Sequence, residues 1–382
     1  MKKSFSDIVQ EAEAGLRKRL AVKVPAWAEA VPDLVLPARL NVEQCSSAAA
    51  ARYKAAVAQR IAGPGARIAD LTGGLGVDAW AFAAVATEVL HNEMDPALSA
   101  AVQHNFALLG VRNAVFRNIE VRPGSVREIL GGFRPDLLYL DPARRSDTGR
   151  KVFRLEDCSP DLLALQEELL AVCPRMLVKL SPMADLTLLR RQLNGLAELH
   201  VVAVRGECKE LLLRLDAAAN PQDTTLIVSE IQDNQTYSLP FSTAQVNAPC
   251  PGAEANGLTE GKWLFEPGAA LMKSDCHAAA CVAAGLKKLA PSTQLYVADS
   301  PVEILSPFGR FRKILEVRPL DKRTIAEVGR RYPQAEVTAR NIPMTSDDLR
   351  RRLGVTSGPE IHIYGTTAAS RRLLLITEAS PN

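Results

Sequence analysis

The chain has 382 residues, of which 47% are hydrophobic and 23% are charged, and its formal net charge is +3. This size allows two or three globular domains with ordinary cores. No apolar run approaches the ~18 residues that a membrane span requires, and Lys2 and Lys3 precede no apolar block, so neither a span nor a signal peptide is expected. The seven cysteines include no C-x-x-C pair. They indicate reduced thiols in a cytoplasmic protein and imply no metal site.

Helices are expected in the N-terminal region, residues 1–60. The pattern of residues 8–20 is amphipathic, and residues 48–61 follow Ser46-Ser47, a pair suited to capping a helix. Three prolines between these two stretches exclude one continuous helix.

Short apolar runs alternate with helical patterns from Arg67 to Asp216. Strands are expected at residues 66–71, 88–93, 114–121, 136–141, 175–181 and 200–206, and in the run ECKELLLRLD that follows them. The last two strands are joined by a short turn and predict an antiparallel hairpin. The alternation predicts an α/β fold over residues 61–218, a Rossmann-like seven-stranded sheet with helices on both faces.

The periodic signal weakens after Asp216. Residues 278–290 have a helical pattern, and short strands and helices alternate from Leu295 onward, as in a small α+β module. We expect domain boundaries near residues 218 and 320, which leave a linking segment at 219–320 and a C-terminal module at 321–382.

A glycine-rich turn follows the first expected strand. Gly74 and Gly76 begin a match to the G-x-G-x-x-[GA] pattern of a nucleotide-binding turn. Asp70 stands at the strand tip, where a carboxylate would repel the pyrophosphate of NAD and attract the ammonium and sulfonium of S-adenosylmethionine. Glu93, at the end of the second strand, is placed to accept hydrogen bonds from ribose hydroxyls, which both cofactors carry. Asp95 is the alternative.

The fourth expected strand ends in Asp141-Pro142-Ala143-Arg144, where class I methyltransferases that modify nucleobases carry D-P-P-x or N-P-P-x. Together with the glycine turn and Glu93, this motif resembles the class I S-adenosylmethionine-dependent methyltransferase family. More narrowly, the chain is similar to a bacterial group that adds a ferredoxin-like segment and a C-terminal THUMP-like domain. The segments that carry this likeness are EQCSSAAAARYKA, LDPARR, KLSPM, ECKELL, EPGAALMK, and AEVTARNIPMTSDDLRRRLGV with IHIYGTT.

The resemblance implies S-adenosylmethionine as the cofactor, a ferredoxin-like part within residues 219–320 and a THUMP-like RNA-docking domain at residues 321–382. The cofactor-binding residues that it implies are Asp70, Thr72, Gly73, Gly74, Gly76, Glu93, Met94, Ser125 and Asp141. The sequence departs from the family pattern at two positions. Ser125 stands where an acid usually contacts the adenine amine, although its hydroxyl can still accept a hydrogen bond. Arg144 stands where an aromatic ring stacks on a flipped base, so a guanidinium would have to stack instead.

The residues at the strand ends favour methyl transfer to a nitrogen. Carbon-5 methylation of a pyrimidine requires a cysteine nucleophile, and the fourth and fifth expected strands end in LDPARRS and KLSPM, without one. Transfer to a base nitrogen requires close alignment and a hydrogen-bond acceptor. We assign the catalytic role to Asp141, with Pro142 fixing the strand-end backbone and Arg144 beside the pocket. Helix capping is the alternative role for Asp141.

Basic residues are concentrated between Arg310 and Arg352, where twelve Lys or Arg stand against six Asp or Glu. This distribution favours a polyanionic partner such as RNA, and a solvated helical face is the alternative. The candidates for phosphate contact are Arg144, Arg145, Lys179, Arg340, Arg350 and Arg351.

These features predict an S-adenosylmethionine-dependent methyltransferase that modifies a base nitrogen of tRNA or rRNA. Methyl transfer to a small molecule or a protein side chain stays open. So does a non-catalytic RNA-binding protein that retains the fold. An NAD-dependent dehydrogenase is disfavoured by Asp70 and by the motif at Asp141.

Overall fold

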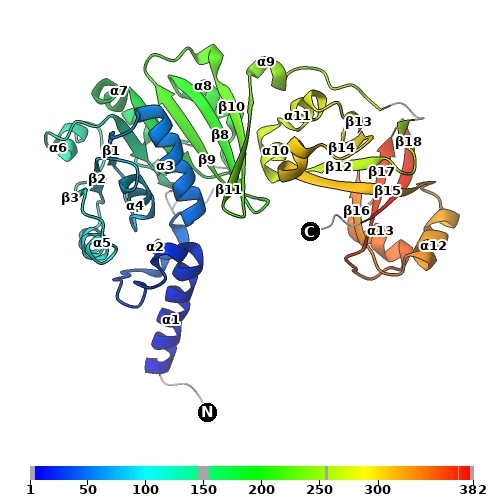
Figure 1. Ribbon diagram of the computed structural model, residues 1–382, viewed down its shortest axis with the longest axis horizontal. Helices are drawn as coiled ribbons and strands as arrows, with labels where there is room; N and C mark the ends of the chain where they lie inside the picture. The colour runs from blue at the N-terminus through cyan, green and yellow to red at the C-terminus, as the bar shows by residue number, and fades with distance from the viewer. Residues whose placement is uncertain (1–4, 145–154, 254–256, 369, 379–382) are drawn as a thin grey trace. The chain divides into compact units, whose positions relative to one another are not determined.

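The computed structural model describes residues 5–144, 155–253, 257–368 and 370–378, without the side chains of residues 5–10, Arg144 and Pro221. The chain divides into two compact units. The first comprises residues 1–204, 209–227 and 233–236, and the second comprises residues 205–208, 228–232 and 237–382. Figure 1 shows the elements of both units.

The N-terminal region forms three helices, α1 (Phe5–Lys23), α2 (Arg39–Gln44) and α3 (Ala48–Ala62). The hydroxyl of Ser47 caps α3 by accepting a hydrogen bond from the backbone N–H of Ala50, as the sequence predicts for this serine pair. The segment between α1 and α2 is held through backbone hydrogen bonds of Val35 to the side chain of Asn105. The side-chain amide of Asn105 accepts from the N–H of Val35 at 2.8 Å and donates to its carbonyl at 2.9 Å. The N-terminal region is therefore fastened to the rest of the first unit.

A nine-stranded sheet has the order β11-β10-β8-β9-β7-β4-β1-β2-β3. Its strands are β1 (Arg67–Asp70), β2 (Glu88–Asn92), β3 (Ala114–Arg117), β4 (Leu137–Leu140), β7 (Arg175–Leu180), β8 (Leu196–Val204), β9 (Glu207–Asp216), β10 (Thr225–Gln232) and β11 (Gln235–Phe241). All seven predicted strands are present, and β9 runs antiparallel to β7. The predicted seven-stranded fold is confirmed. The β10–β11 hairpin, which the sequence analysis did not identify, extends the sheet beyond β8.

The central strands are buried along their whole length. In β4 every residue is at most 1% exposed, as expected for a parallel strand covered on both faces. The covering helices are α4 (Val77–Ala83), α5 (Pro96–Leu108), α6 (Val126–Leu130), α7 (Leu162–Val172) and α8 (Leu186–Gln192). The parallel strands end at one shared edge, where open α/β sheets bind their ligands. Just beyond β4, the short strands β5 (Ala143–Arg144) and β6 (Cys158–Ser159) pair with each other.

The second unit contains a seven-stranded sheet with the order β13-β14-β12-β15-β18-β17-β16. Its strands are β12 (Trp263–Pro267), β13 (Lys287–Ala290), β14 (Thr293–Ala298), β15 (Gly309–Pro319), β16 (Glu336–Arg340), β17 (Ile361–Ala368) and β18 (Arg371–Glu378). The helices are α9 (Thr243–Val246), α10 (Ala269–Ser274), α11 (His277–Ala283), α12 (Lys322–Arg331) and α13 (Ser346–Leu353). Strand β15 pairs with both β12 and β18. The boundary predicted near residue 320 thus falls inside one sheet, and the predicted domain limits remain predictions.

The helix predicted over residues 278–290 is wrong in its second half. Helix α11 ends at Ala283, and Lys287–Ala290 forms β13, paired with β14. Gly285 lies between them with φ +75°, a left-handed conformation that ends helices and that glycine adopts without strain.

None of the helices in the described ranges combines the length and the hydropathy that crossing a lipid bilayer requires.

Two glycines provide a test of helix packing. A Cβ at Gly329 of α12 would lie 1.8 Å from the carbonyl oxygen of Leu353, whereas a Cβ at Gly15 of α1 would meet nothing within 4 Å. We expect Gly329→Ala to lower the free energy of unfolding by about 1–3 kcal/mol, because α12 and α13 must move apart. The control Gly15→Ala is expected to raise it by about 0.5–1 kcal/mol. Urea unfolding followed by circular dichroism measures both, and equal midpoints for the two variants would contradict this account.

Candidate active site

A cavity of about 720 Å³ lies at the carboxyl edge of the nine-stranded sheet, within the size range of small-molecule sites. It is lined by the glycine turn after β1, the residues after β2 and β3, the ends of β4 and β7, the start of β9, and part of the N-terminal region. The structure brings together here most of the predicted cofactor-binding residues, namely Asp70, Thr72, Gly73, Gly74, Gly76, Glu93, Met94 and Asp141.

Asp70 ends β1 and is only 1% exposed. Its Oδ1 accepts a hydrogen bond from the N–H of Thr72 at 3.0 Å, while its buried Oδ2 has no hydrogen-bond partner among the described residues. Burial raises the pKa of Asp70 well above its ordinary value, and the nearby carboxylates of Asp78, Asp141 and Glu93 raise it further. A cationic group in the cavity would balance this carboxylate, so the residue fits the ammonium or sulfonium of S-adenosylmethionine.

The glycine turn packs directly on a buried histidine of β2. A Cβ at Gly73 would lie 2.1 Å from Nε2 of His91, and burial lowers the pKa of His91 to about 4. His91 is therefore neutral at physiological pH. Gly74 and Gly76 have φ values of +53° and +81°, which residues with a side chain rarely adopt. These glycines let the turn lie flat between His91 and the cavity.

Glu93 lies beside the turn, as predicted. Its Oε2 accepts from the N–H of Gly74 and its Oε1 from the N–H of Asp95, both at 2.9 Å. Each carboxylate oxygen keeps a second lone pair for a ribose hydroxyl. Asp95, the alternative, caps α5 through hydrogen bonds that its Oδ1 accepts from the N–H groups of Ala97 and Leu98, and the ribose contact of Glu93 remains a prediction.

Ser125 is not among the residues that line the cavity. Its hydroxyl donates to the carbonyl of Arg122 at 2.7 Å and accepts from the N–H of the same residue at 2.9 Å. This local turn occupies the hydroxyl, so the structure does not bring Ser125 to a cofactor. Ile119, Glu120 and Val121 line the cavity from the segment after β3 instead.

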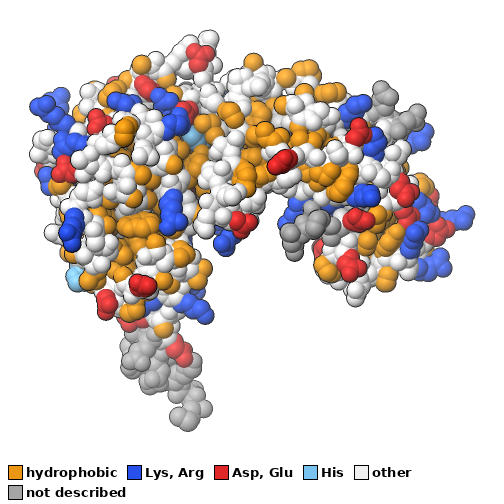
Figure 2. Space-filling model, viewed as in Figure 1, with side chains coloured by type: hydrophobic (Ala, Val, Ile, Leu, Met, Phe, Trp, Pro, Cys, Tyr) orange, Lys and Arg blue, Asp and Glu red, His pale blue; other side chains and the backbone are white. Residues whose placement is uncertain are grey.

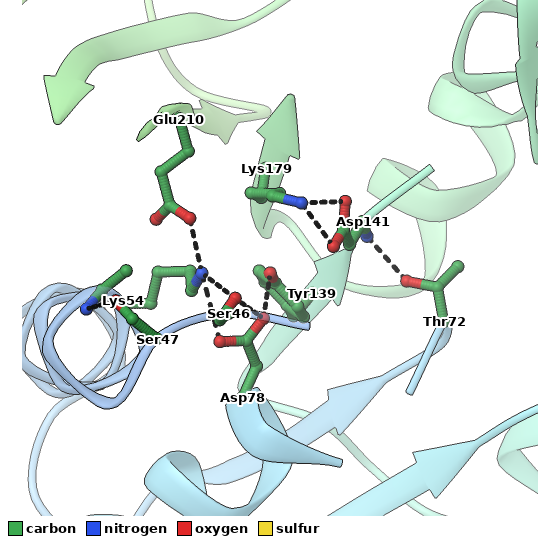
Figure 3. Close-up of polar contacts among 10 residues, drawn as sticks. Ser46, Ser47, Lys54, Thr72, Asp78, Tyr139, Asp141, Lys179 and Glu210 are labelled. Atoms are coloured by element: carbon green, nitrogen blue, oxygen red, sulfur yellow. Dashed lines mark hydrogen bonds and ion pairs between the residues drawn. The ribbon is translucent and has the colours of Figure 1, made fainter. Parts of the chain in front are cut away.

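Asp141 follows β4 and is held on two sides (Figure 3). Its backbone N–H donates to Oγ1 of Thr72 at 2.6 Å, and both of its carboxylate oxygens accept from Nζ of Lys179, at 2.9 and 2.8 Å. Burial opposes the charge of Lys179, but the carboxylates of Asp141 and Glu210 together leave the pKa of the lysine raised. Pro142 is buried next to Asp141. The ion pair fixes the orientation of the Asp141 carboxylate.

Lys179, predicted to contact RNA, thus lies inside the cavity as the partner of Asp141. The backbone of Arg144 is described, in β5, but its side chain is not, and Arg145 lies outside the described residues. The predicted roles of these two arginines remain predictions.

A buried polar cluster centred on Lys54 lies beside the Asp141–Lys179 pair, and Figure 3 shows its members converging. Lys54 of α3 is fully buried; its Nζ donates to Glu210 at 2.9 Å and to Ser46 at 2.8 Å, and lies 3.1 Å from Asp78. Asp78 also accepts from the hydroxyls of Ser46 at 2.9 Å and Tyr139 at 2.8 Å. Burial works against the charge of Lys54, but Asp78 and Glu210 outweigh it and raise its pKa. Ser46 and Asp78 reach the cavity wall.

The sequence analysis missed this cluster, although it left a trace in the sequence. Lys54 lies among buried residues of α3, including Ala51, Ala55 and Ala58, where a lysine is unexpected without a partner. Glu210 likewise begins the buried run of β9. Two isolated charges in apolar stretches predict a buried pair, but nothing local shows that these two meet.

The arginines predicted to contact RNA in the second unit are engaged with carboxylates. Arg340 pairs with Glu266 at 3.0 Å, Arg350 lies 3.7 Å from Glu336, and Arg351 pairs with Asp348. Figure 2 shows basic and acidic side chains mixed in this region. Each of these arginines already has a carboxylate partner, and RNA contact by the three arginines remains a prediction.

No group of three or more His, Cys, Asp or Glu side chains is arranged to hold a metal ion in the part of the chain that the structure describes. Next to Cys276, Nδ1 of His277 is hydrogen-bonded to the hydroxyl of Tyr296 at 2.7 Å.

Strands β3, β2, β1, β4 and β7 are parallel, and β9 beside them is antiparallel. Together with an acid at the tip of β1 beside a glycine turn and D-P-A-R after β4, these strands define a class I S-adenosylmethionine-dependent methyltransferase. Two family models match the second unit. One describes a ferredoxin-like domain and covers residues 263–304, and the other describes a THUMP-like domain and covers residues 309–379.

Among solved structures, a proposed methyltransferase from Porphyromonas gingivalis W83 is 30% identical, with a TM-score of 0.84. The match covers 96% of this chain and 89% of that chain. The chain belongs to this family of bacterial class I methyltransferases with ferredoxin-like and THUMP-like domains.

More distant matches include TrmN from Thermus thermophilus, at 19% identity and a TM-score of 0.31, covering 43% of this chain and 48% of that one. SMU.1697c from Streptococcus mutans, solved with SAH, matches at 9% identity and a TM-score of 0.31, covering 43% of this chain and 95% of that one. A comparison with curated protein sequences found no match.

The buried cluster makes the stability of the first unit depend on Lys54. We expect Lys54→Met to lower the free energy of unfolding by about 3–5 kcal/mol at pH 8, because Asp78 and Glu210 lose their buried counter-ion. Burial already raises the pKa of Glu210, and without Lys54 the main group that opposes this effect is lost, although Lys179 still lowers that pKa. The folded variant then binds protons that the unfolded chain does not, so the loss shrinks as the pH falls.

Urea unfolding of the wild type and Lys54→Met at pH 8 and pH 6 measures this difference. The double variant Lys54→Met/Glu210→Gln is expected to regain part of the lost stability, since it removes one unpaired carboxylate. A loss that is the same at both pH values, with no recovery in the double variant, would show that the lysine acts only through packing.

Proposed function

We propose that the protein transfers a methyl group from S-adenosylmethionine to a base nitrogen of tRNA or rRNA. The observation that carries this proposal is the position of Asp141. Its carboxylate, fixed by Lys179 and Thr72, lines the same cavity as the glycine turn and the unbalanced carboxylate of Asp70.

The donor end of the cavity is formed by β1, β2 and the residues after them. In the proposed complex Asp70 binds the ammonium group of the donor, and Glu93 accepts hydrogen bonds from its ribose hydroxyls. Gly73, Gly74 and Gly76 allow the backbone to approach the donor closely. When bound, S-adenosylmethionine supplies an electrophilic methyl group on its sulfonium.

Asp141 holds the acceptor. Each of its oxygens accepts one hydrogen bond from Lys179 and retains a lone pair for an N–H of the target base. The hydrogen bond orients the nitrogen toward the methyl group, and positioning of this kind lowers the barrier without a covalent step. Thr72 links the glycine turn to the backbone of Asp141. It thereby fixes the position of the donor end of the cavity relative to the acceptor end.

RNA as the acceptor is supported by three features of the chain. The second unit matches a THUMP-like model, the region from Arg310 to Arg352 is rich in basic residues, and D-P-A-R resembles the motif of base-modifying enzymes. A THUMP-like module offers a second contact with RNA away from the target base, which would offset the cost of extruding that base from a helix.

The donor assignment predicts the behaviour of Asp70→Asn. We expect this variant to bind S-adenosylmethionine about 10–100-fold more weakly, because a charge-assisted hydrogen bond becomes a neutral one. Wild-type affinity is expected to fall as the pH is lowered through the raised pKa of Asp70, since only the ionised form attracts the cation, and the variant should lose this dependence. Isothermal titration calorimetry between pH 5 and 8 measures both effects.

Asp136→Asn is a matched control for this variant. Its carboxylate also accepts a backbone N–H, from Arg67 at 2.8 Å, but Asp136 is not among the cavity-lining residues. Equal affinities for Asp70→Asn and Asp136→Asn would refute the donor assignment.

The acceptor assignment predicts that Asp141→Asn lowers kcat by about 100-fold. The amide has one oxygen in place of two carboxylate oxygens, so it orients the N–H of the target base less well and stabilises less of the positive charge that develops on it. Its affinity for S-adenosylmethionine should change less than threefold, about 0.6 kcal/mol, since Asp70 and Glu93 are retained. Substrate RNA is identified first by comparing methylated nucleosides, by mass spectrometry, in tRNA and rRNA from cells with and without the gene. If no nucleoside is lost from either RNA, the acceptor is not one of these RNAs, and a small molecule or protein becomes the better hypothesis.

A further inference from the structure

An exposed methionine lies at the edge of the cavity. Met183 lines the cavity, although the residue is 72% exposed. A single exposed apolar side chain is ordinary on a protein surface, so exposure alone assigns no role to this residue. Its position at the acceptor end of the cavity is what points to one.

Met183 belongs to the loop that follows β7, the strand that carries Lys179. Ser181, Pro182 and Met183 all line the cavity. The Oγ of Ser181 accepts a hydrogen bond from the backbone N–H of Met183 at 3.2 Å, a local turn that orders the backbone of the loop. Lys179 holds the carboxylate of Asp141 (Figure 3). The loop therefore begins beside this ion pair and places Met183 at the same end of the cavity.

A second apolar segment follows Asp141 itself. Pro142 and Ala143 come directly after it in the chain, and both line the cavity together with Pro160. Ala143 pairs with Ser159 in the antiparallel ladder of β5 and β6, which makes Pro142 and Pro160 the next pair along that ladder. Apolar groups therefore border the Asp141 carboxylate along β5 and β6, and the loop after β7 adds others.

These apolar groups stand where other base-modifying enzymes use an aromatic ring. No Phe, Tyr or Trp is among the described residues that line the cavity, and Arg144 occupies the position of the ring in the motif after β4. A nucleobase has two flat faces, and RNA-binding proteins cover such faces by stacking. Among the described lining residues that follow Asp141 and Lys179, the large apolar side chains are prolines and Met183.

Met183 is the best suited of these side chains to cover a base. The thioether of methionine is polarisable and makes favourable contacts with aromatic rings, and its unbranched chain adapts to flat surfaces of different size. Pro142 is buried, and Pro160 and Pro182 are half-buried. Met183 therefore has more apolar surface left for a bound base to remove from water.

We propose that Met183 packs against the face of the acceptor base while Asp141 binds its edge. This inference rests on the proposed function, because it places a nucleobase in the cavity. It assigns to the loop after β7 the contact that an aromatic ring after β4 makes in enzymes with the D-P-P-x motif. A thioether can cover purines and pyrimidines alike, so the choice of base falls to the groups that contact its edge.

The test uses tRNA and rRNA from cells without the gene as substrates and measures the transfer of radiolabelled methyl groups from S-adenosylmethionine. We expect Met183→Ala to lower kcat/KM for the RNA that accepts the methyl group by about 3–10-fold, the effect of one lost thioether–ring contact. Leu188→Ala is the matched control and should have the kcat/KM of the wild type. Leu188 lies in α8, directly after the loop, and is 36% exposed, but it is not among the residues that line the cavity.

A third variant separates stacking on the base from the structure of the loop. Met183→Phe places a ring against the base and is expected to keep or raise kcat/KM. The affinity for S-adenosylmethionine, measured by calorimetry, should be unchanged in all three variants, since Met183 lies at the acceptor end. The midpoint of urea unfolding should also be unchanged in both Met183 variants, because the residue is mostly exposed.

The outcomes distinguish this inference from the proposed function. If the wild type methylates RNA but Met183→Ala matches it, the contact with the base is wrong and the proposed function stands. An equal loss in Leu188→Ala, or a Met183→Phe variant as slow as Met183→Ala, would show that the loop acts through its structure and would also overturn the contact. Weaker binding of S-adenosylmethionine by Met183→Ala would place the side chain against the donor and overturn it as well. If the wild type transfers no methyl group to either RNA, the proposed function fails together with this inference.

Discussion

Burial of acidic side chains beside the cavity is the constraint on which the whole site depends. Asp70, Asp78 and Glu210 are each at most 8% exposed, and a carboxylate removed from water must be paired or protonated. Lys54 serves two of them at once. Asp70 has one oxygen without a partner among the described residues. A cationic ligand restores the balance there, which is the physical basis for assigning Asp70 to a positively charged methyl donor and not to a dinucleotide.

The need to pair buried carboxylates with a cation also explains why the N-terminal region belongs to the candidate active site. Lys54 lies in the middle of α3, and Ser46 lies just before that helix. They complete a cluster whose other members are Asp78 of α4, Tyr139 of β4 and Glu210 of β9. Without α3, the buried carboxylates of Asp78 and Glu210 would lose the lysine that pairs with both of them, at a cost of several kcal/mol. The helices that precede the sheet are therefore a structural requirement of the cavity, and they supply part of its wall.

Local sequence patterns predicted the strands of the sheet and the acids at the strand ends. Apolar runs between turn residues identified the seven strands, and acids at strand ends identified Asp70, Glu93 and Asp141, because the carboxyl ends of parallel strands share one edge. Pairings between distant segments were not predictable: Lys54 and Glu210 are 156 residues apart, and no spacing rule joins them. The end of α11 was missed because Leu286 and Leu289 continue its apolar pattern, and only the left-handed Gly285 separates helix from strand. Ser125 was placed by analogy with other sequences, whereas its hydroxyl is held by its own turn.

The fixed position of Asp141 also bears on the chemistry of the proposed reaction. In the proposed reaction, methyl transfer moves positive charge from the donor toward the acceptor nitrogen, that is, from the Asp70 end of the cavity toward Asp141. A carboxylate fixed at the receiving end stabilises that charge as it develops, and it does so without reorganising, because Lys179 and Thr72 already hold it. Lys179 limits how strongly Asp141 can attract the cation, since it offsets part of the carboxylate's charge. The pair is thus suited to a neutral acceptor that becomes positive only during the transfer, which a base nitrogen does and a permanently protonated amine does not.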